Sequence, residues 1–213
     1  MIVVTGFEPF GKYSENPSGE VAKALNSERI MNQEIRGIVL PVAYRRAKRI
    51  IEETLMKYRP LIFLGIGLAP GSPSIKLERI AINIMDFKKP DNDGEKPVDI
   101  PIYPDGPLAY MATIPIRRVC KVLRERGIPA VISYNAGTFL CNFVFYTTLY
   151  NVDKLQLKTK VGFVHIPCDV GQVAKGDQML PSMSICLVIK AIRTIIRATL
   201  EEMNEKTFYS SNI

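Results

Sequence analysis

LIFLGIGL, residues 61–68, is an unbroken apolar stretch, and such a stretch predicts a strand that is buried on both faces of a sheet. Two more strands are predicted before it, over 2–6 (IVVTG) and 35–42 (IRGIVLPV). A helix is expected between these two from Pro17, because proline suits a first helical turn. A second, amphipathic helix is expected over 43–57. This alternation of strands and helices indicates an α/β sheet that is covered on both faces.

The same alternation continues toward the C-terminus. The further predicted elements are an extended segment over 74–84, a helix from Pro115, a strand over 130–134, a helix over 138–150, a strand over 161–167 and a helix from Ser182 to about Asn204. The last helix is apolar over much of its circumference, which suggests a contact between subunits. Residues 88–108 are rich in proline, glycine and acidic side chains, and they predict a long loop that is functional. One domain is expected over residues 1–213, with 205–213 as a loose polar tail.

The composition limits the class of protein. The 213 residues are 47% hydrophobic and 23% charged, and no apolar run reaches the ~18 residues of a membrane span. The N-terminal MIVVTGF has neither a basic leader nor a signal-peptide core, so the cytoplasm is the expected location. The net charge is +7, but the basic residues are scattered, which argues against a nucleic-acid partner. Four cysteines without a C-x-x-C pair and a single histidine argue against a disulfide scaffold, a redox centre or a zinc site. No metal or cofactor is expected.

Cys141 is the candidate nucleophile. It lies in NAGTFLCN (135–142), where a polar turn leads into the apolar run FVFYTTLY, so it falls in the first turn of a predicted helix. Backbone N–H groups and the helix dipole at such a position lower the pKa of a thiol and can stabilise an oxyanion. Cys168 is a rival, because it lies close to the only histidine, but no apolar helix is predicted directly after it. Cys186 lies on the final helix and suits a core or an interface.

His165 is the only histidine that could serve as a base for this thiol. It ends the predicted strand 161–167, and ligand sites of open α/β sheets gather at the carboxyl ends of strands. Glu78 is notable among the possible orienting acids, because it interrupts an apolar extended stretch, and buried acids seldom lack a partner. A structural salt bridge with a neighbouring basic residue explains Glu78 equally well. The residues alone therefore leave the acid open among Glu78, Asp86, Asp91, Asp93 and Asp169.

Several motifs resemble those of the pyroglutamyl peptidase type I (pyrrolidone-carboxylate peptidase) family. In chain order they are TGFEPFG near the start, ERIAIN (78–83), PDNDG (90–94), NAGTFLCN (135–142) and GFVHIP (162–167). The resemblance covers nearly the whole chain. It implies a cysteine exopeptidase with a triad of Cys141, His165 and Glu78, which removes an N-terminal pyroglutamyl (5-oxoprolyl) residue from peptides. It also implies a single-domain three-layer α/β/α sandwich with a mixed, mostly parallel sheet, assembled as a dimer or tetramer and without metal.

The resemblance also implies a substrate pocket. Phe7 and Phe10 would form aromatic walls, Phe139 and Leu140 would line the lactam ring, and Asn16 would support the first of these loops. Such a slot would be uncharged, so that a peptide with an ordinary charged N-terminus would be rejected by the cost of burying that charge.

The chain departs from the family pattern in two places, and two other functions stay open. After Pro167 the family usually has an aromatic or apolar residue, where this chain has Cys168 and Asp169. The family usually has an arginine near the oxyanion site where this chain has Lys88, and lysine keeps the charge but loses the rigid fork of donors. The first alternative function is a nucleoside phosphorylase-like glycosyl transferase, because the implied fold is shared with such enzymes. The second is a non-catalytic basic binding protein.

Overall fold

The fold is built on a seven-stranded sheet with the strand order β2-β3-β1-β4-β9-β5-β8. The computed structural model describes residues 1–11, 14–176 and 179–210, and only the backbone of 206–210. The sheet strands are β1 (Ile2–Phe7), β2 (Arg29–Ile30), β3 (Gln33–Leu40), β4 (Ile62–Leu68), β5 (Ile75–Glu78), β8 (Ala130–Ser133) and β9 (Lys160–Ile166). A separate hairpin pairs β6 (Ile80–Ile82) with β7 (Ala109–Met111).

The sheet is mixed but mostly parallel, as predicted. Strands β3, β1, β4 and β9 run parallel to one another at its centre. Strand β5 is antiparallel to β9, whereas β8 is parallel to β5 and the short β2 is antiparallel to β3. The central position of β4 explains its unbroken apolar sequence, because nearly all of its residues are buried between the layers.

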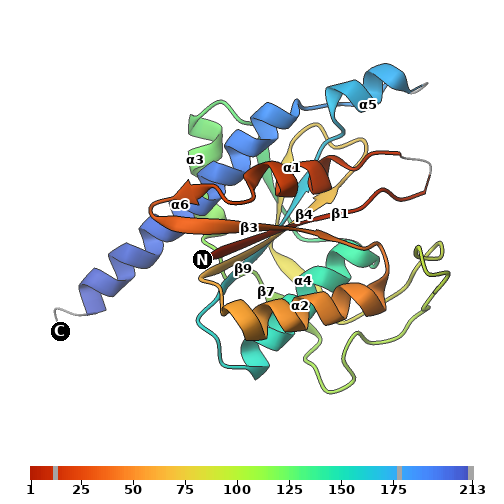
Figure 1. The fold of residues 1–213 in the computed structure, drawn as a ribbon, viewed down its shortest axis with the longest axis horizontal. Coiled ribbons are helices and arrows are strands. Elements are labelled where there is room, and N and C mark those ends of the chain that lie inside the picture. Colours follow the sequence, from red (N-terminus) through yellow and green to blue (C-terminus); the bar gives the residue numbers. More distant parts are fainter. Residues whose placement is uncertain (12–13, 177–178, 211–213) are drawn as a thin grey trace.

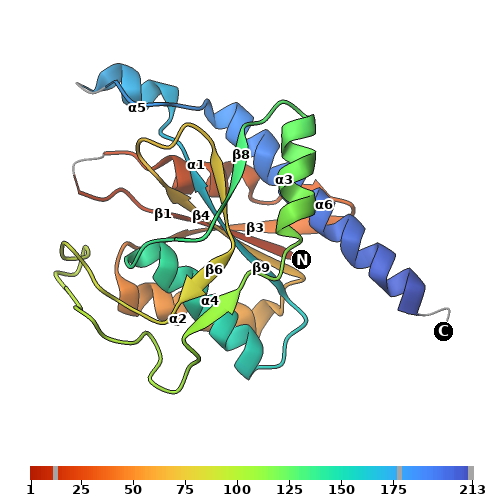
Figure 2. The ribbon, with the colours of Figure 1, turned by 180° about the vertical axis from the view of Figure 1, so that it is seen from behind.

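Helices cover both faces of the sheet and complete a single-domain three-layer sandwich. The helices are α1 (Pro17–Leu25), α2 (Tyr44–Tyr58), α3 (Ile116–Glu125), α4 (Leu140–Lys154), α5 (Val170–Lys175) and α6 (Ile185–Ser210). Figures 1 and 2 show α1, α3 and α6 on one face and α2 with α4 on the other. The predicted fold class is therefore confirmed.

Helix α4 carries little polar surface because it is enclosed on several sides. It packs against α2, against β4 and β9 of the sheet, and against the hairpin of β6 and β7. Most of its residues are buried as a result, including the aromatic run from Phe143 to Tyr146. The loop between β6 and β7 spans residues 83–108, so it is long, as predicted over 88–108, and Figure 1 shows it beside α2 and α4.

The structure differs from the sequence-based expectations in three places. The short strands β2 and β7 were not predicted, because two or three residues carry no clear periodicity. Helix α5 starts directly after Asp169, which caps it with a reciprocal capping box, so a short helix does follow Cys168. The expected tail over 205–213 is helical as far as Ser210, where α6 ends, and 211–213 lie outside the described residues. In Figure 1 the second half of α6 extends beyond the body of the domain.

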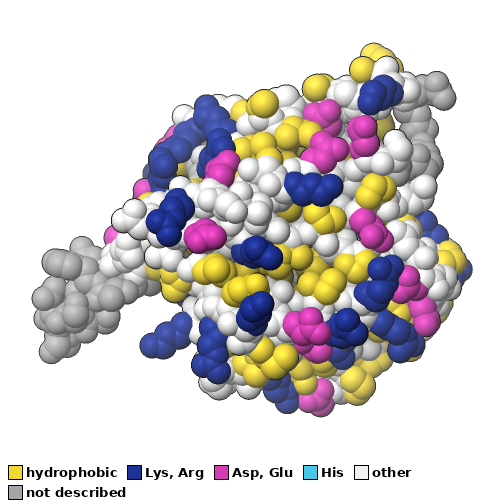
Figure 3. Space-filling view, viewed as in Figure 1, with side chains coloured by type: hydrophobic (Ala, Val, Ile, Leu, Met, Phe, Trp, Pro, Cys, Tyr) yellow, Lys and Arg dark blue, Asp and Glu magenta, His cyan; other side chains and the backbone are white. Residues whose placement is uncertain are grey.

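The surface carries both signs of charge. On the face shown in Figure 3, lysine and arginine side chains alternate with acidic ones and form no continuous stripe. No helix within the described residues is long and apolar enough to cross a membrane.

Candidate active site

Cys141 is the second residue of α4, where the loop after β8 turns into the buried helix. Phe139, which precedes the helix, has an extended backbone and provides no side-chain cap. The backbone N–H of Phe143 donates to the carbonyl of Phe139 and starts the helical ladder. The N–H groups of Leu140, Cys141 and Asn142 therefore lie ahead of this ladder, at the positive end of the helix dipole. Cys141 thus lies in the first helical turn, as predicted.

His165 and Glu78 come from two neighbouring antiparallel strands, β9 and β5. His165 lies near the carboxyl end of β9, and its Nδ1 atom is 2.8 Å from Oε1 of Glu78. Glu78 is fully buried and His165 is 8% exposed. Because an ionised carboxylate only accepts, Nδ1 carries the proton and Nε2 is left for another partner. The other carboxylate oxygen, Oε2, is buried and has no hydrogen-bond partner among the described residues.

Cys141 lies within hydrogen-bonding reach of the His165 ring, so the structure brings the three predicted residues together. Burial alone lowers the pKa of His165, but the negative charge and hydrogen bond of Cys141, followed by those of Glu78, raise this pKa to about 10. These contacts favour the protonated, imidazolium form of His165. Such an arrangement provides a nucleophile, a proton donor and a group that orients the ring.

Gly67 makes room for the sulfur of Cys141, and sequence reasoning missed this residue. It lies opposite His165 in the parallel register of β4 and β9. A Cβ atom added at Gly67 would lie 2.7 Å from Sγ of Cys141, closer than ordinary contact. At Gly65, on the same face of β4, the added Cβ would meet the ring of Phe163 at 2.5 Å. The sequence does contain a signal, since glycines two residues apart in a buried strand mark a close approach on one face.

A cavity of about 220 Å³ opens beside Cys141. Its lining includes Cys141 and all five residues predicted to bind substrate, which are Phe7, Phe10, Asn16, Phe139 and Leu140. The ring centroids of Phe10 and Phe139 are 5.2 Å apart, and Phe139 in turn contacts Phe87 edge to face at 4.5 Å. Val42, Leu68 and Pro70 complete the apolar part of the lining. A small, uncharged ring suits the apolar wall of this cavity.

The substrate slot was predicted to be uncharged, and this prediction is wrong. Two charged residues, Glu15 and Lys89, also line the cavity. The Nζ atom of Lys89 lies 4.0 Å from the ring centroid of Phe10. Lys88, which was predicted to lie in the oxyanion region, is exposed and does not line the cavity. Lys89 is exposed as well, but it lines the cavity, so only one of these two consecutive lysines faces it.

The remaining cysteines do not resemble nucleophiles, and all four thiols are free. Cys168, the rival in the sequence, is buried, and this burial raises the pKa of its thiol. Cys120 is also buried, whereas Cys186 is exposed on α6. Among the residues that the structure describes, no cluster of histidine, cysteine and acidic side chains could hold a metal ion.

Comparison with known proteins agrees with this geometry. Residues 1–202 match the model for the pyroglutamyl peptidase family. The chain belongs to this family. Its relatives include the pyrrolidone-carboxylate peptidases of Thermococcus litoralis, 43% identical over 208 residues (96% of this chain and 94% of the relative), and Pyrococcus furiosus, 42% identical over 206 residues (95% and 99%). The solved structure of the Thermococcus litoralis pyrrolidone carboxyl peptidase superposes with a TM-score of 0.94 at 42% identity, over 96% of this chain and 95% of that one.

The family resemblance predicted from the sequence is therefore confirmed, and the chain is a cysteine peptidase of the pyroglutamyl peptidase family. Family membership favours the peptidase over both a glycosyl transferase and a non-catalytic binding protein.

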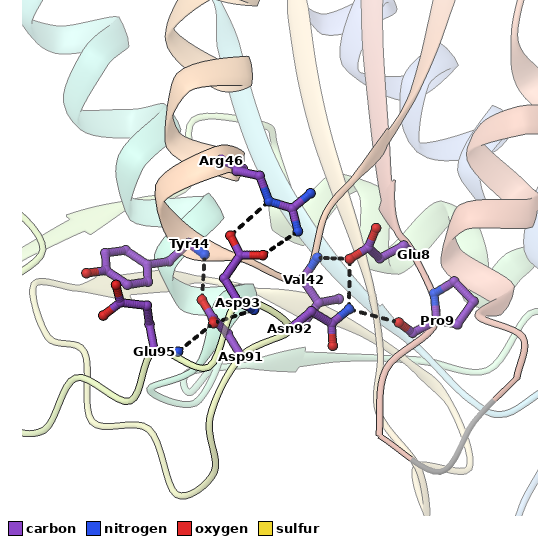
Figure 4. Close-up of polar contacts among 9 residues, drawn as sticks. All are labelled: Glu8, Pro9, Val42, Tyr44, Arg46, Asp91, Asn92, Asp93 and Glu95. Atoms are coloured by element: carbon purple, nitrogen blue, oxygen red, sulfur yellow. Dashed lines mark hydrogen bonds and ion pairs between the residues drawn. The ribbon is translucent and has the colours of Figure 1, made fainter.

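In this pyroglutamyl peptidase family member, the PDNDG motif joins three parts of the chain (Figure 4). Oδ2 of the buried Asp91 accepts from the backbone N–H of Tyr44 at 3.0 Å, so it caps the first turn of α2. Its Oδ1 accepts from the N–H groups of Asp93 and Glu95. Ala43 precedes α2 and offers no side-chain cap, so the long loop supplies the cap from a distance.

Asn92 connects the same motif to the loop after β1. Its Nδ2 donates to Oε1 of Glu8 at 2.7 Å and to the carbonyl of Pro9 at 3.3 Å (Figure 4). Oε1 of Glu8 also accepts from the backbone N–H of Val42. We call this set of hydrogen bonds, made by Glu8, Asp91 and Asn92, the loop clamp. It fixes the loops that carry Phe10 and Lys89, two residues that line the cavity.

Asn16 holds the first of these loops from the other side. Its Nδ2 donates to the carbonyl of Glu8 at 3.0 Å, and its Oδ1 accepts from the backbone and the hydroxyl of Ser18. The Ser18 hydroxyl oxygen accepts from the N–H of Phe7. Asn16 therefore caps α1 and supports the loop, while its predicted contact with substrate stays a prediction.

Asn142, next to the nucleophile candidate, was not singled out in the sequence. It is fully buried and bonds twice to the backbone of Ile82, accepting from its N–H at 2.9 Å and donating to its carbonyl at 2.8 Å. Its Nδ2 also donates to the carbonyl of Ile84. These bonds fix the first turn of α4 against β6, and so they fix the backbone that carries Cys141. A buried asparagine in an apolar run was the available signal.

Proposed function

We propose that this enzyme is an exopeptidase that removes an N-terminal pyroglutamyl residue from peptides through a Cys141, His165 and Glu78 triad. The observation that carries the proposal is the 2.8 Å contact between His165 Nδ1 and Glu78 Oε1, with Cys141 against the same ring and beside an apolar cavity. The names of the relatives, pyrrolidone-carboxylate peptidases, support the same substrate class.

In the first half of the reaction, the thiolate of Cys141 attacks the carbonyl carbon that joins the pyroglutamyl residue to the next one. The negative charge that develops on the carbonyl oxygen is stabilised by N–H groups at the start of α4, including that of Cys141. One such donor typically contributes ~3 kcal/mol to the stability of the transition state. The C–N bond then breaks, His165 gives its proton to the departing amine, and a thioester remains on Cys141.

In the second half, water hydrolyses the thioester. The neutral His165 takes a proton from the water, which attacks the same carbonyl carbon. The C–S bond breaks, free pyroglutamate leaves, and the thiolate of Cys141 returns beside the imidazolium. Glu78 keeps Nδ1 of His165 protonated in both halves, so Nε2 is always the atom that exchanges the proton with substrate.

The apolar wall of the cavity suits a peptide substrate whose N-terminal residue is a lactam. Pyroglutamate has no charged amino group, and its flat ring matches a wall of phenylalanine and leucine side chains. The dimer or tetramer and the cytoplasmic location expected from the sequence stay predictions.

The test is the release of a fluorophore from a pyroglutamyl amide by the purified protein. Cys141→Ala and treatment with iodoacetamide are each expected to abolish this release. Cys186→Ser, which removes the exposed thiol of α6, is the matched control and is expected to retain activity. Activity that persists in Cys141→Ala would refute the assignment of the nucleophile.

A further inference from the structure

Lys89 places a positive charge on the wall of the substrate cavity. Its Nζ atom lies 4.0 Å from the ring centroid of Phe10, which is itself part of the wall. The same atom would lie 3.4 Å from a Cβ added at Gly11, so the ammonium rests against the turn that follows Phe10. The attraction between a cation and the face of an aromatic ring favours this position.

The exposed side chain of Lys89 has no carboxylate partner among the described residues. Within the part of the chain that the structure describes, Lys89 takes part in no ion pair, and its contact is with the Phe10 ring. Glu15 is the other charged residue of the lining, but its Oε1 lies 3.6 Å from Nζ of Lys175. A molecule in the cavity therefore meets an ammonium that pairs with no carboxylate of the described residues, and a carboxylate that already has a counter-ion.

The loop clamp limits how far Lys89 can move from the cavity. Asn92, three residues further along, is bonded to Glu8 and Pro9 in the loop that carries Phe10. On the other side, the buried Phe87 donates its N–H to the carbonyl of Pro97. The backbone on both sides of Lys89 is thus fixed. The ammonium can therefore move away from the cavity only if the Lys89 side chain changes conformation and loses its contact with the Phe10 ring.

We propose that Lys89 is a specificity-determining residue, whose ammonium repels any substrate with a protonated amine on its first residue and leaves uncharged lactams unaffected. This inference rests on the proposed function. Proline and 5-oxoproline form rings of the same size, but proline at an N-terminus carries a protonated amine and no ring carbonyl. Two like charges near a protein surface repel by an amount that changes binding by about tenfold or more. Rejection of ordinary N-termini would then depend on this charge as well as on the apolar wall.

The experiment compares the binding of two small amides, pyroglutamyl amide and prolinamide, at pH 6.5, where the amine of prolinamide is protonated. Binding is followed through the ring resonances of His165, the only histidine of the chain, so the readout does not require turnover. The variants are Lys89→Met, Lys89→Arg and Lys89→Glu. Lys96→Met is the matched control, because Lys96 is exposed on the same loop and does not line the cavity.

In Lys89→Met we expect prolinamide to bind about tenfold more tightly than in the native protein, with pyroglutamyl amide changed by less than about threefold. Lys89→Glu should bind prolinamide more tightly still, whereas Lys89→Arg and Lys96→Met should resemble the native protein. A graded response to charge separates this role from a merely steric one, which would not follow the sign of the charge.

Unchanged prolinamide binding in Lys89→Met and Lys89→Glu would overturn the inference, and so would equal changes for both amides. The proposed function fails separately, if the native protein neither binds pyroglutamyl amide nor releases a fluorophore from its derivative.

Discussion

Gly67 lies opposite His165 in the register of β4 and β9, and the space beside it that a side chain would fill holds the sulfur of Cys141. The missing side chain at position 67 is therefore part of the geometry of the site. It lets the sulfur lie next to the ring of His165, near the carboxyl end of β9. Any atom added at this place must compete with the sulfur for the same volume.

Gly67→Ala is expected to lower kcat/KM for a pyroglutamyl amide by about 100-fold or more, because a misplacement of about 1 Å has effects of this size. The new Cβ would lie 2.7 Å from Sγ, and Cys141 has one side-chain torsion with which to move it away from His165. The rate of alkylation by iodoacetamide should fall as well. Gly65→Ala is the control, because its Cβ meets the Phe163 ring instead and should mainly lower the free energy of unfolding. A Gly67→Ala variant with native kcat/KM would show that the sulfur does not need this space.

The titration of His165 should depend on Cys141. The thiolate is the strongest of the influences that raise the pKa of His165 to about 10. Cys141→Ala removes that charge, while the burial that lowers the pKa remains, so the pKa must fall. Because the chain has one histidine, NMR of the ring protons reports this pKa without assignment. An identical titration in the native protein and in Cys141→Ala would mean that the two side chains are not coupled.

The same coupling predicts the alkaline limit of activity. His165 must be an imidazolium to protonate the departing amine, and its pKa of about 10 keeps it protonated through neutral pH. As the pH rises through about 10, this proton is lost and kcat/KM should fall. A pH profile of kcat/KM, measured with the fluorogenic amide, checks the position of this limit. A fall centred near the ordinary histidine value of about 6.5 would contradict the raised pKa.

The order of the main elements could be predicted from the sequence because their periodicity is strong. Strand β4 has the continuous apolar run of a central strand, and α4 begins where the polar turn before Phe139 ends. Helix α5 was missed because its six residues are too few to show a helical period, although Asp169 and Gln172 have the spacing of a capping box.

The site could be predicted only in part from local sequence. Cys141 and His165 were found by their places at the ends of elements, but the acid stayed open until the family resemblance pointed to Glu78. The reason is physical: Glu78 meets His165 through the antiparallel pairing of β5 with β9, across 87 positions, and spacing in the sequence does not reveal such a pairing. The charge of Lys89 in the cavity depends in the same way on how a long loop is fixed.

Glu78→Gln is expected to lower kcat/KM by at least about 100-fold. The amide oxygen can still accept from Nδ1 of His165, but the negative charge that helps to raise the pKa of the ring is lost. The NMR titration should therefore show a lower pKa for His165 than in the native protein. Glu53→Gln, at an exposed ion pair on α2, is a control that should change neither quantity. Native activity in Glu78→Gln would remove Glu78 from the mechanism.

Asn92→Ala tests whether the loop clamp keeps the cavity in shape. The substitution removes the hydrogen bonds to Oε1 of Glu8 and to the carbonyl of Pro9. We expect a loss of about 1 kcal/mol in the free energy of unfolding, typical of one net hydrogen bond. The larger effect should be on KM, which should rise by about three- to tenfold with kcat nearly unchanged, because the loops carry cavity walls and not the triad.

The matched control for the clamp is Arg46→Met. Arg46 binds Asp93 of the same motif through two hydrogen bonds, but both side chains are exposed, and among the described residues neither is hydrogen-bonded to the loop that carries Phe10. Exposed ion pairs contribute little to stability, so this variant should keep the native KM and nearly the native stability. If Arg46→Met raised KM as much as Asn92→Ala, the effect would come from general loosening of the motif. If only Asn92→Ala raised KM, the bond between the two loops would be what holds the cavity open to substrate.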